Sequence, residues 1–288
     1  MMYLILSVVF TILVFVILKE FNRFKVDNFQ AIVINYFVAF TTGVFFDDVL
    51  YSTNQILTKP WVWGAIAIAV LFIIGFNLMA VTAQKLGLFM MTVSSKMSMM
   101  IPIIVGVMLY QDKIGYLKLF GVILALFGVW FVAKKKETSR YDKSYWYLPF
   151  LIFIVGGVAD SLINHMQTQM VGHQEQAQFT SVLFLFCGLI GMVVLVASLL
   201  RGKKKICFKS WLGGVVLGVP NYFTIYYLVK ALSYSHFGTA FIFSFNNVFI
   251  VIGSLLLGVW VYKEKLSLHN YIGLVLSLSA IAVLYFAV

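Results

Sequence analysis

Two charged residues interrupt apolar segments of this sequence of 288 residues. Lys96 lies near the middle of the apolar run 87–110, among three serines, and Asp160 lies inside the run 146–170. A charge at the centre of a bilayer costs about 2.5–3.5 kcal/mol on insertion scales, so we expect both side chains to face protein or water. We predict that Lys96 binds a carboxylate or phosphate of a solute and that Asp160 is its counter-charge. The alternative is a static ion pair that joins two parts of the chain.

Amide and tyrosine side chains in other apolar runs extend this candidate site. Asn164 follows Asp160 by four residues, which places both on one face of a helix. Asn247 occupies the place in the second half of the chain that the lysine occupies in the first. Gly218 and Pro220 predict a local break in another spanning helix. The predicted substrate-binding residues are Lys96, Asp160, Asn164, Asn221, Tyr222, Tyr226, Asn246 and Asn247.

The sequence has no motif for catalysis, nucleotide hydrolysis or metal binding. The patterns H-E-x-x-H, G-x-S-x-G and G-x4-G-K-[ST] are missing, and the four histidines are scattered. Cys187 and Cys207 have the spacing of neither a disulfide framework nor a metal site. We therefore predict that the protein is not an enzyme and has no catalytic residue, metal or cofactor.

The composition predicts that these residues are carried by membrane-spanning helices. Hydrophobic residues make up 62% of the chain and charged residues 11%, whereas soluble domains have roughly 25% charged residues. The mean hydropathy is +0.99. The apolar runs have about the length that a spanning helix needs, and they are too uniformly apolar for barrel strands. We predict an all-α membrane protein with ten transmembrane helices, in the ranges 3–18, 29–46, 61–83, 87–110, 117–133, 146–170, 179–200, 211–232, 237–262 and 271–288.

The net charge of +11 collects in short loops between these runs, which argues for a topology signal and against a nucleic-acid partner. The loops 134–144 and 201–209 each carry five Lys or Arg residues. The positive-inside rule places these loops in the cytoplasm and both termini outside.

The chain contains the same five-helix unit twice. The tetrapeptides 110–113 (YQDK) and 262–265 (YKEK) follow the fourth run of each unit, and Gly121 matches Gly273 at the same offset of about 152 residues. The units are residues 1–138 and 139–288. Because each unit has an odd number of crossings, we predict that the second is inverted relative to the first.

This repeated pattern resembles the drug/metabolite transporter superfamily, specifically the ten-helix type built from two EamA units. The resemblance rests on the paired A-x6-G turns (Ala80 to Gly87, Ala231 to Gly238), on Pro102, on the acidic residue after the fourth helix of each unit (Asp112, Glu264) and on the G-x6-G or G-x6-A helices that follow. It implies an inner-membrane carrier of small metabolites with both termini in the cytoplasm, opposite to the loop charges. The chain departs from the family pattern at Asp112, where Glu is more usual, and near Ser254, where the second copy lacks the proline.

Small residues and isolated amides predict how the helices pack. We expect Asn35 and Asn77 to hold helices together rather than to bind a solute. Gly121, Ala125 and Gly128, with their mates Gly273, Ser277 and Ala280, form smooth faces that favour close packing within the chain. We therefore expect a monomer, with a homodimer through these faces as the alternative.

The expected function is that of a secondary transporter of a small polar or anionic metabolite, such as an amino acid or a carboxylate. It would work by alternating access in the inner membrane, with the solute and the lipid bilayer as its partners. One alternative is proton-coupled efflux of lipophilic cations through Asp160, although Lys96 would repel a cation. The other is a membrane assembly subunit that transports nothing.

Overall fold

The computed structural model describes residues 1–47, 56, 58–102, 104–105, 115–133, 145–172, 175–202, 205–234 and 239–286. Ten α-helices of at least ten residues lie in these ranges, and none of the described residues is in a strand, which confirms the predicted all-α class for this part of the chain. The helices are α1 (Met2–Glu20), α2 (Asn28–Asp47), α4 (Val62–Lys85), α5 (Leu88–Met97), α7 (Tyr116–Ala133), α8 (Leu148–Gln169), α9 (Gln176–Leu200), α10 (Phe208–Tyr234), α11 (Thr239–Trp260) and α12 (Leu268–Phe286). The predicted tetrapeptide 110–113, the loop 134–144 and Gly238 lie outside the described residues.

Length and hydropathy identify the membrane-crossing helices. In the described residues, α1, α2, α4, α8, α9 and α10 each contain a stretch long and apolar enough to cross a bilayer. Shorter apolar stretches lie at Leu119–Val132, Phe245–Trp260 and Leu268–Val283. Because lipid offers no partner for backbone N–H and C=O groups, helices satisfy these groups within one segment. The chain is therefore a membrane protein with several spanning helices.

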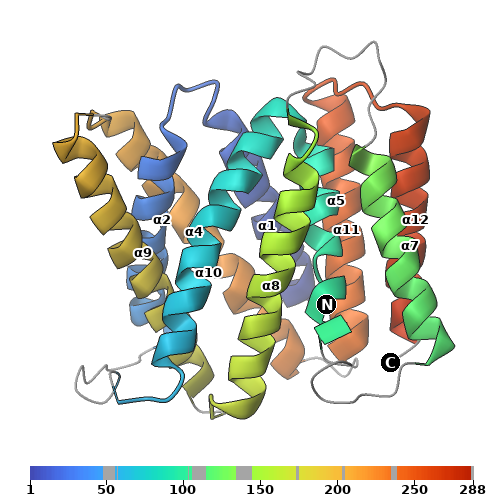
Figure 1. Cartoon of the computed structure of the whole chain (residues 1–288), viewed down its shortest axis with the longest axis horizontal. Coiled ribbons are helices and arrows are strands. Elements are labelled where there is room, and N and C mark those ends of the chain that lie inside the picture. Colours follow the sequence, from blue (N-terminus) through green and yellow to red (C-terminus); the bar gives the residue numbers. More distant parts are fainter. Residues whose placement is uncertain are drawn as a thin grey trace.

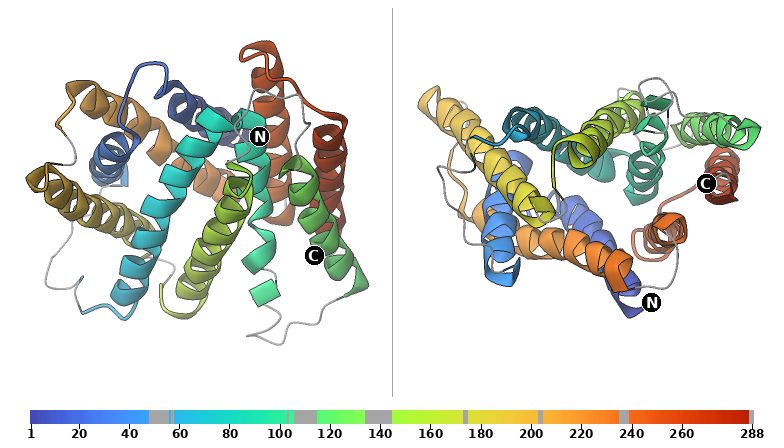
Figure 2. Two further views of the ribbon diagram at one scale, coloured as in Figure 1. Left: turned by 45° about the horizontal axis from the view of Figure 1, so that its top comes forward. Right: turned by 90° about the horizontal axis from the view of Figure 1, so that it is seen from below.

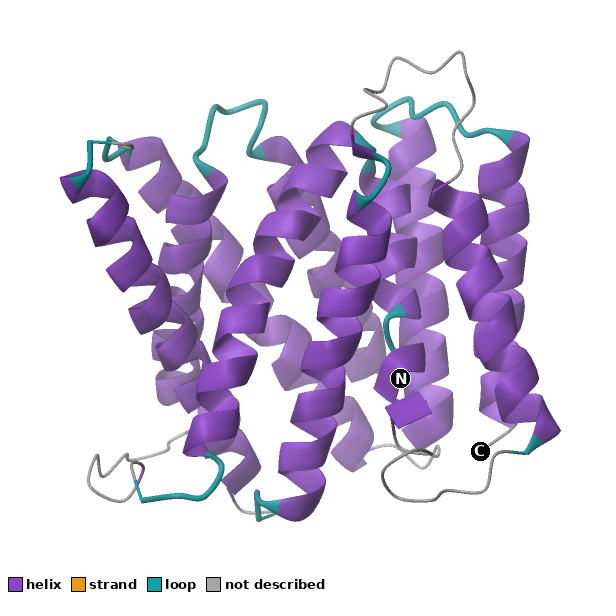
Figure 3. Ribbon diagram, viewed as in Figure 1, coloured by secondary structure: helices purple, strands orange, loops and turns teal. Residues whose placement is uncertain are grey.

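The helices stand side by side and alternate in direction along the chain (Figure 1, Figure 3). The loops after α1, α4, α9 and α11 lie at one end of the molecule, here called the loop end, while α1 begins and α12 ends toward the opposite end (Figure 1). Seen along the helices, α7 and α12 form one edge of the bundle and α9 lies at the other (Figure 2). The basic residues of the described loops and helix ends at the loop end are Lys19, Arg23, Lys25, Lys85, Arg201, Lys205, Lys209, Lys263 and Lys265.

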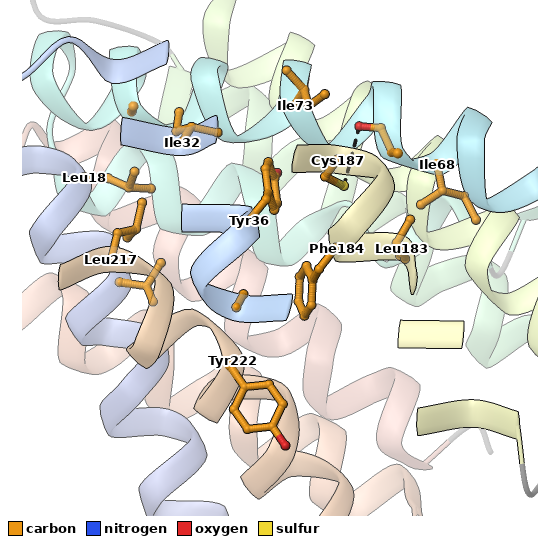
Figure 4. Packing of buried hydrophobic residues seen from close by; sticks show 14 of the residues in the cluster. Leu18, Ile32, Tyr36, Ile68, Ile73, Leu183, Phe184, Cys187, Leu217 and Tyr222 are labelled. Atoms are coloured by element: carbon orange, nitrogen blue, oxygen red, sulfur yellow. Dashed lines mark hydrogen bonds between the residues drawn. The ribbon is translucent and has the colours of Figure 1, made fainter. Parts of the chain in front are cut away.

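The largest apolar cluster joins α1, α2, α4, α9 and α10 (Figure 4). Tyr36 is fully buried there, with its ring 5.6 Å from that of Phe76 and 6.2 Å from that of Phe184. Cys187 is also buried, and its Sγ lies 3.8 Å from the carbonyl oxygen of Ala69 (Figure 4). This thiol is therefore part of the packed interior between α4 and α9.

The break predicted in α10 is wrong. α10 is continuous from Phe208 to Tyr234 with Pro220 inside it. Gly218 has a different use, because a Cβ atom there would lie 2.6 Å from Val38 Cβ and 2.8 Å from the carbonyl oxygen of Asn35. The glycine lets α2 approach α10 closely, and spanning helices tolerate proline when neighbours support the backbone.

The smooth faces of α7 and α12 pack against each other. A Cβ atom on Gly273 would lie 2.8 Å from the backbone nitrogen of Val132 and 2.9 Å from the carbonyl oxygen of Gly128, and Asn270 Nδ2 donates to the carbonyl oxygen of Val132 at 2.9 Å. Packing within the chain therefore uses these residues, as expected for helices joined through small side chains.

The first testable consequence is that Gly273→Ala destabilises the α7–α12 pair. The new methyl group meets backbone atoms that a rotamer change cannot move, and overpacking of this kind typically costs about 1–3 kcal/mol. We expect a lower melting temperature of the purified protein in detergent. Gly115→Ala is the matched control, because a Cβ atom there has no neighbour within 4 Å among the described residues. Equal melting temperatures for the two variants would contradict the packing described here.

The second consequence concerns sidedness, and Cys207 reports it. Cys207 lies in the α9–α10 loop, and its hydrogen bonds to Ser210 lower the pKa of the thiol below its ordinary value, which favours the reactive thiolate. The positive-inside rule predicts that a membrane-impermeant maleimide labels Cys207 in inside-out vesicles and not in intact cells. Cys187 is buried and should stay unlabelled in both. Labelling in intact cells would place the termini in the cytoplasm instead.

Candidate functional site

The centre of the candidate site is a helix break. The apolar run 87–110 was expected to form one helix, but α5 ends at Met97 and a turn follows at Ser98–Met99. Pro102 explains the position, because it has no N–H to donate to the carbonyl of Ser98, four residues earlier. That carbonyl instead accepts the N–H of Ile101 at 3.0 Å. The chain then becomes helical again at residues 100–102.

Two glycines of α8 accommodate this turn. A Cβ atom on Gly156 would lie 3.1 Å from Ser98 Oγ, and one on Gly157 would lie 2.3 Å from Ile101 Cδ1. The turn therefore lies directly against α8. Small residues allow this approach of two backbones.

Lys96 lies in the last turn of α5 and is half-buried. Nine residues separate it from Gly87 at the start of the helix, so at 1.5 Å per residue it lies roughly 14 Å from that end, close to half of a hydrocarbon core of about 30 Å. A cation at a helix C-terminus is favoured by the helix dipole. The ammonium group also lies 5.9 Å from the centroid of the Phe15 ring of α1, within the range of a cation–π interaction.

Asp160 reaches the same turn from α8. Its Oδ2 lies 3.2 Å from Ser98 Oγ, whose single proton is shared between this carboxylate and the carbonyl oxygen of Ser95 at 2.6 Å. The charges of Asp160 and Lys96 interact across the gap between α5 and α8. None of the ion pairs among the described residues joins Lys96 to Asp160. The structure thus places the predicted counter-charge beside Lys96 without a direct salt bridge.

α8 has two exposed faces of different chemistry. Ile154 and Val158 lie on an exposed apolar face that suits lipid. Asp160, Asn164 and Gln167 are exposed on the opposite side, since each residue turns the helix by about 100°. Polar side chains within a membrane almost always face the bundle interior or a water-filled space. Asn164 therefore shares a face with Asp160, as its spacing predicts.

The two asparagines of α11 are buried. Asn247 Nδ2 lies 3.0 Å from Met99 Sδ, in the turn after α5. Asn246 Oδ1 is buried and has no hydrogen-bond partner among the described residues. The turn therefore brings α5 together with α8 and α11, while Lys96 faces the Phe15 ring of α1.

Asn221, Tyr222 and Tyr226 lie on α10 beside α2. Asn221 Nδ2 donates to Asn35 Oδ1 at 3.1 Å, which confirms the expected role of Asn35 in holding helices together. The Tyr222 ring lies 5.7 Å from that of Tyr226 and 6.2 Å from that of Phe46, and Tyr222 is nearly fully buried (Figure 4). The second predicted amide, Asn77, donates to the carbonyl oxygen of Ile73 in its own helix.

Glu264 has a structural role that the sequence did not predict. Its carboxylate accepts the backbone N–H of Leu88 at 2.7 Å and that of Phe89 at 3.4 Å, so it caps α5, and it forms an ion pair with Lys19 of α1. Gly87, at a φ of +106°, leaves the carboxylate room, because a Cβ atom there would lie 2.8 Å from Glu264 Cδ. The signal in the sequence was the pairing of an A-x6-G turn with an acidic residue. An A-x6-G turn and an acidic residue after the fourth helix occur in each half of the chain.

Tyr262 completes this cluster at the loop end. The Lys19 ammonium lies 4.0 Å from the centroid of the Tyr262 ring. Burial, together with a hydrogen bond to Glu20, raises the pKa of the Tyr262 hydroxyl well above its ordinary value, so the hydroxyl keeps its proton at neutral pH. The phenol therefore adds no negative charge beside Glu264.

A second ion pair joins the two halves near the opposite end of the molecule. Lys59 Nζ lies 2.6 Å from Glu175 Oε1, just before α9, and Trp61 Nε1 donates to Glu175 Oε2 at 3.2 Å. These hydrogen bonds lower the pKa of the Glu175 carboxyl. The resulting stabilisation is present at neutral pH and is lost as the pH falls through that lowered pKa.

Comparison with known proteins identifies the fold of the second half. The sequence model of the EamA-like transporter family matches residues 148–286, which contain α8 to α12. This half is an EamA-like transporter unit. The family is part of the drug/metabolite transporter superfamily, so the resemblance predicted from the motifs is confirmed for residues 148–286. An uncharacterized protein of Haemophilus influenzae is 25% identical over 294 aligned positions, which cover 98% of this chain and 97% of that protein.

The position of Glu264 within the EamA-like unit gives its motif a physical role. The acidic residue follows the fourth helix of this unit and caps a helix of the other half of the chain. Backbone N–H groups and the helix dipole both favour an anion at that position. The motif thus ties α5, α1 and the α11–α12 loop together.

The third testable consequence compares the two ion pairs. Removing one partner of a buried ion pair costs about 3–5 kcal/mol, whereas exposed pairs contribute about 0–1 kcal/mol. The Glu264 side chain is 5% exposed and that of Glu175 is 30% exposed. We therefore expect Glu264→Ala to lower the melting temperature far more than Glu175→Ala. Similar losses in the two variants would show that the cap and the buried pair contribute little.

Proposed function

We propose that the chain is a secondary transporter for a small metabolite that carries a carboxylate, most simply an amino acid, and that it works by alternating access across the inner membrane. The EamA-like unit supports transport as the general function. In this proposal the chain has ten spanning helices, in two inverted units that cover residues 1–138 and 139–288. The solute binds where the units meet.

The helix contacts support two related units. In the first half α1 contacts α10 and α11, and in the second half the corresponding helix α8 contacts α4 and α5. The contact of α2 with α10 likewise corresponds to that of α9 with α4. α1 and α8 also run in opposite directions in Figure 1. Matching contacts of this kind between helices that run in opposite directions are what inverted repeats produce.

The observation that carries the proposal is the pair of opposite charges at the α5 break. Lys96 and Asp160 belong to different units, interact electrostatically and lack a direct salt bridge. A zwitterion satisfies such a site, because its carboxylate pairs with Lys96 while its amine pairs with Asp160. The discontinuous helix adds to the argument, since transporters often bind solutes at such breaks near the midplane.

The other predicted residues take different roles in this proposal. Asn247 lies at the α5 break, the buried Asn246 precedes it in α11, and Asn164 lies on the polar face of α8, so in this proposal they donate or accept hydrogen bonds with the solute. Asn221, Tyr222 and Tyr226 lie on α10 against α2. In this proposal they belong to the packed contact between the two units.

Efflux of lipophilic cations is the less favoured function. It would use Asp160 as the exchanging carboxylate, but the ammonium of Lys96 next to it opposes the entry of a cation. A subunit that transports nothing would have no use for two separated charges within the membrane, where charged side chains are costly.

The fourth testable consequence is a ligand that depends on Lys96. In a thermal-shift screen of amino acids and other carboxylates, we expect at least one to stabilise the wild-type protein and to lose most of that effect in Lys96→Met and in Asp160→Asn. Lys205→Met is the matched control, because Lys205 is exposed in the α9–α10 loop. The stabilising solute is then tested for uptake into liposomes that contain only this protein.

Two results would reject the proposal. Anions that stabilise wild type and Lys96→Met equally would remove Lys96 from the site. Exchange of lipophilic cations against protons that is lost in Asp160→Asn would favour the efflux function instead.

A further inference from the structure

A polar cavity at the loop end lies apart from the charged pair of the α5 break. Its volume is about 640 Å³, and it is lined by polar side chains from the α1–α2 loop and from α2 and α4. Those that carry the argument are Asn22, Lys25, Asp27, Asn28, Asn77 and Gln84. This volume lies within the range of about 300–1,000 Å³ that is usual for small-molecule sites.

The outer part of the cavity lies at the level of lipid headgroups. Lys25 and Asp27 belong to the α1–α2 loop, and Gln84 directly precedes Lys85, at which α4 ends. Asn77 lies deeper, eight residues or roughly 12 Å from that end of α4. The exposed apolar residues Val70 and Ile74 continue along α4 beyond Asn77 and suit contact with lipid tails. The cavity therefore extends from the headgroup layer into the hydrocarbon core.

Lys25 has an unusual backbone for its residue type. Its φ is +56°, in the left-handed region that glycine adopts most easily. The hydrogen bond from Val26 N to the carbonyl oxygen of Phe21, at 2.9 Å, closes the turn after α1 around it. Its ammonium forms no ion pair or hydrogen bond with the other described residues. A left-handed residue is common where a helix ends in such a turn, as Lys263 also shows, so the positive φ alone indicates no ligand. The available ammonium that lines the cavity is the feature that suits an anionic ligand.

The remaining groups define the chemistry of the ligand. Asn28 and Gln84 are hydrogen-bonded to each other, at 2.9 Å from Gln84 Nε2 to Asn28 Oδ1, and form a fixed wall. Asp27 Oδ1 accepts the N–H of Gln30 as the cap of α2, which holds this carboxylate beside the cavity. Lys25 thus supplies a cation and Asp27 an anion on the α1–α2 loop.

We propose that this cavity binds the headgroup of a phospholipid that carries a primary amine beside its phosphate. Lys25 and the amide of Asn22 hold the phosphate, and Asp27 holds the amine. The acyl chains lie along the exposed strip of α4 that contains Val70 and Ile74. This site needs only that the chain spans a membrane, so it does not depend on which solute is transported.

The experiment uses the full-length protein, delipidated in detergent, with phosphatidylethanolamine, phosphatidylglycerol and free phosphoethanolamine as probes. Binding is measured by native mass spectrometry and by the shift in melting temperature. We expect phosphatidylethanolamine to bind at least fivefold more tightly than phosphatidylglycerol, because only the former has an amine for Asp27. We also expect free phosphoethanolamine to bind far more weakly, because it has no acyl chains.

The decisive variant is Lys25→Gly. Glycine adopts the φ of +56° without strain, so the fold is retained while the ammonium is lost. We expect a loss of at least fivefold in affinity for phosphatidylethanolamine. Lys263→Gly is the matched control, because Lys263 also has a positive φ, of +53°, and does not line the cavity. It should leave lipid binding unchanged.

Asp27→Asn tests the amine contact separately. Asparagine is as good a helix cap as aspartate, so α2 should keep its start. The preference for phosphatidylethanolamine over phosphatidylglycerol should disappear. Three results would overturn the proposal: wild-type lipid affinity in Lys25→Gly, equal affinity of the wild type for the two lipids, or equal affinity for free phosphoethanolamine and the lipid.

Discussion

A bilayer offers no hydrogen-bond partner, so every polar group inside it has to be satisfied by the protein or by enclosed water. This constraint explains the helical class of the chain, and it also governs the exceptions. At the α5 break, Pro102 has no N–H to donate to the carbonyl of Ser98, and that carbonyl accepts the N–H of Ile101 instead. The Ser98 hydroxyl also lies 3.2 Å from Asp160 Oδ2, so the break creates a polar contact between the two halves of the chain.

The same constraint makes α5 a short helix with a complementary charge at each end. Glu264 accepts the N–H groups of Leu88 and Phe89 at its start, and Lys96 lies in its last turn. An anion at the N-terminus and a cation at the C-terminus both lower the energy of the helix dipole. A single ten-residue helix therefore connects the buried ion pair at the loop end with the charged pair near the middle of the membrane.

The sequence predicted the all-helical membrane class and the approximate partners of the charged residues, because both follow from the cost of polar groups in lipid. Asp160 lies beside Lys96 and Asn35 contacts another helix, as that cost requires. The sequence did not predict which proline would break a helix. Pro102 and Pro220 look alike in sequence, but α10 has α2 packed on Gly218 and stays continuous, whereas α5 meets Gly156 and Gly157 of α8 at its turn. The neighbours that decide between these outcomes come from distant parts of the chain. The role of Glu264 was hidden for the same reason, since its partners Lys19 and Leu88 are 245 and 176 residues away.

The two ion pairs between the halves differ in energy, and this difference bears on the proposed alternation of access. The Lys19–Glu264 pair is nearly buried and also caps a helix, whereas the side chains of the Lys59–Glu175 pair are 32% and 30% exposed. Separating the first pair would leave a desolvated carboxylate, while water can replace the partners in the second. In the proposed cycle, opening the bundle at the loop end would therefore cost more free energy than opening it at the opposite end. A ligand can supply that energy only through stronger binding to the open state. α5 carries Lys96 at one end and is capped by Glu264 at the other. A solute bound at Lys96 would therefore contact the same helix that the buried ion pair holds in place.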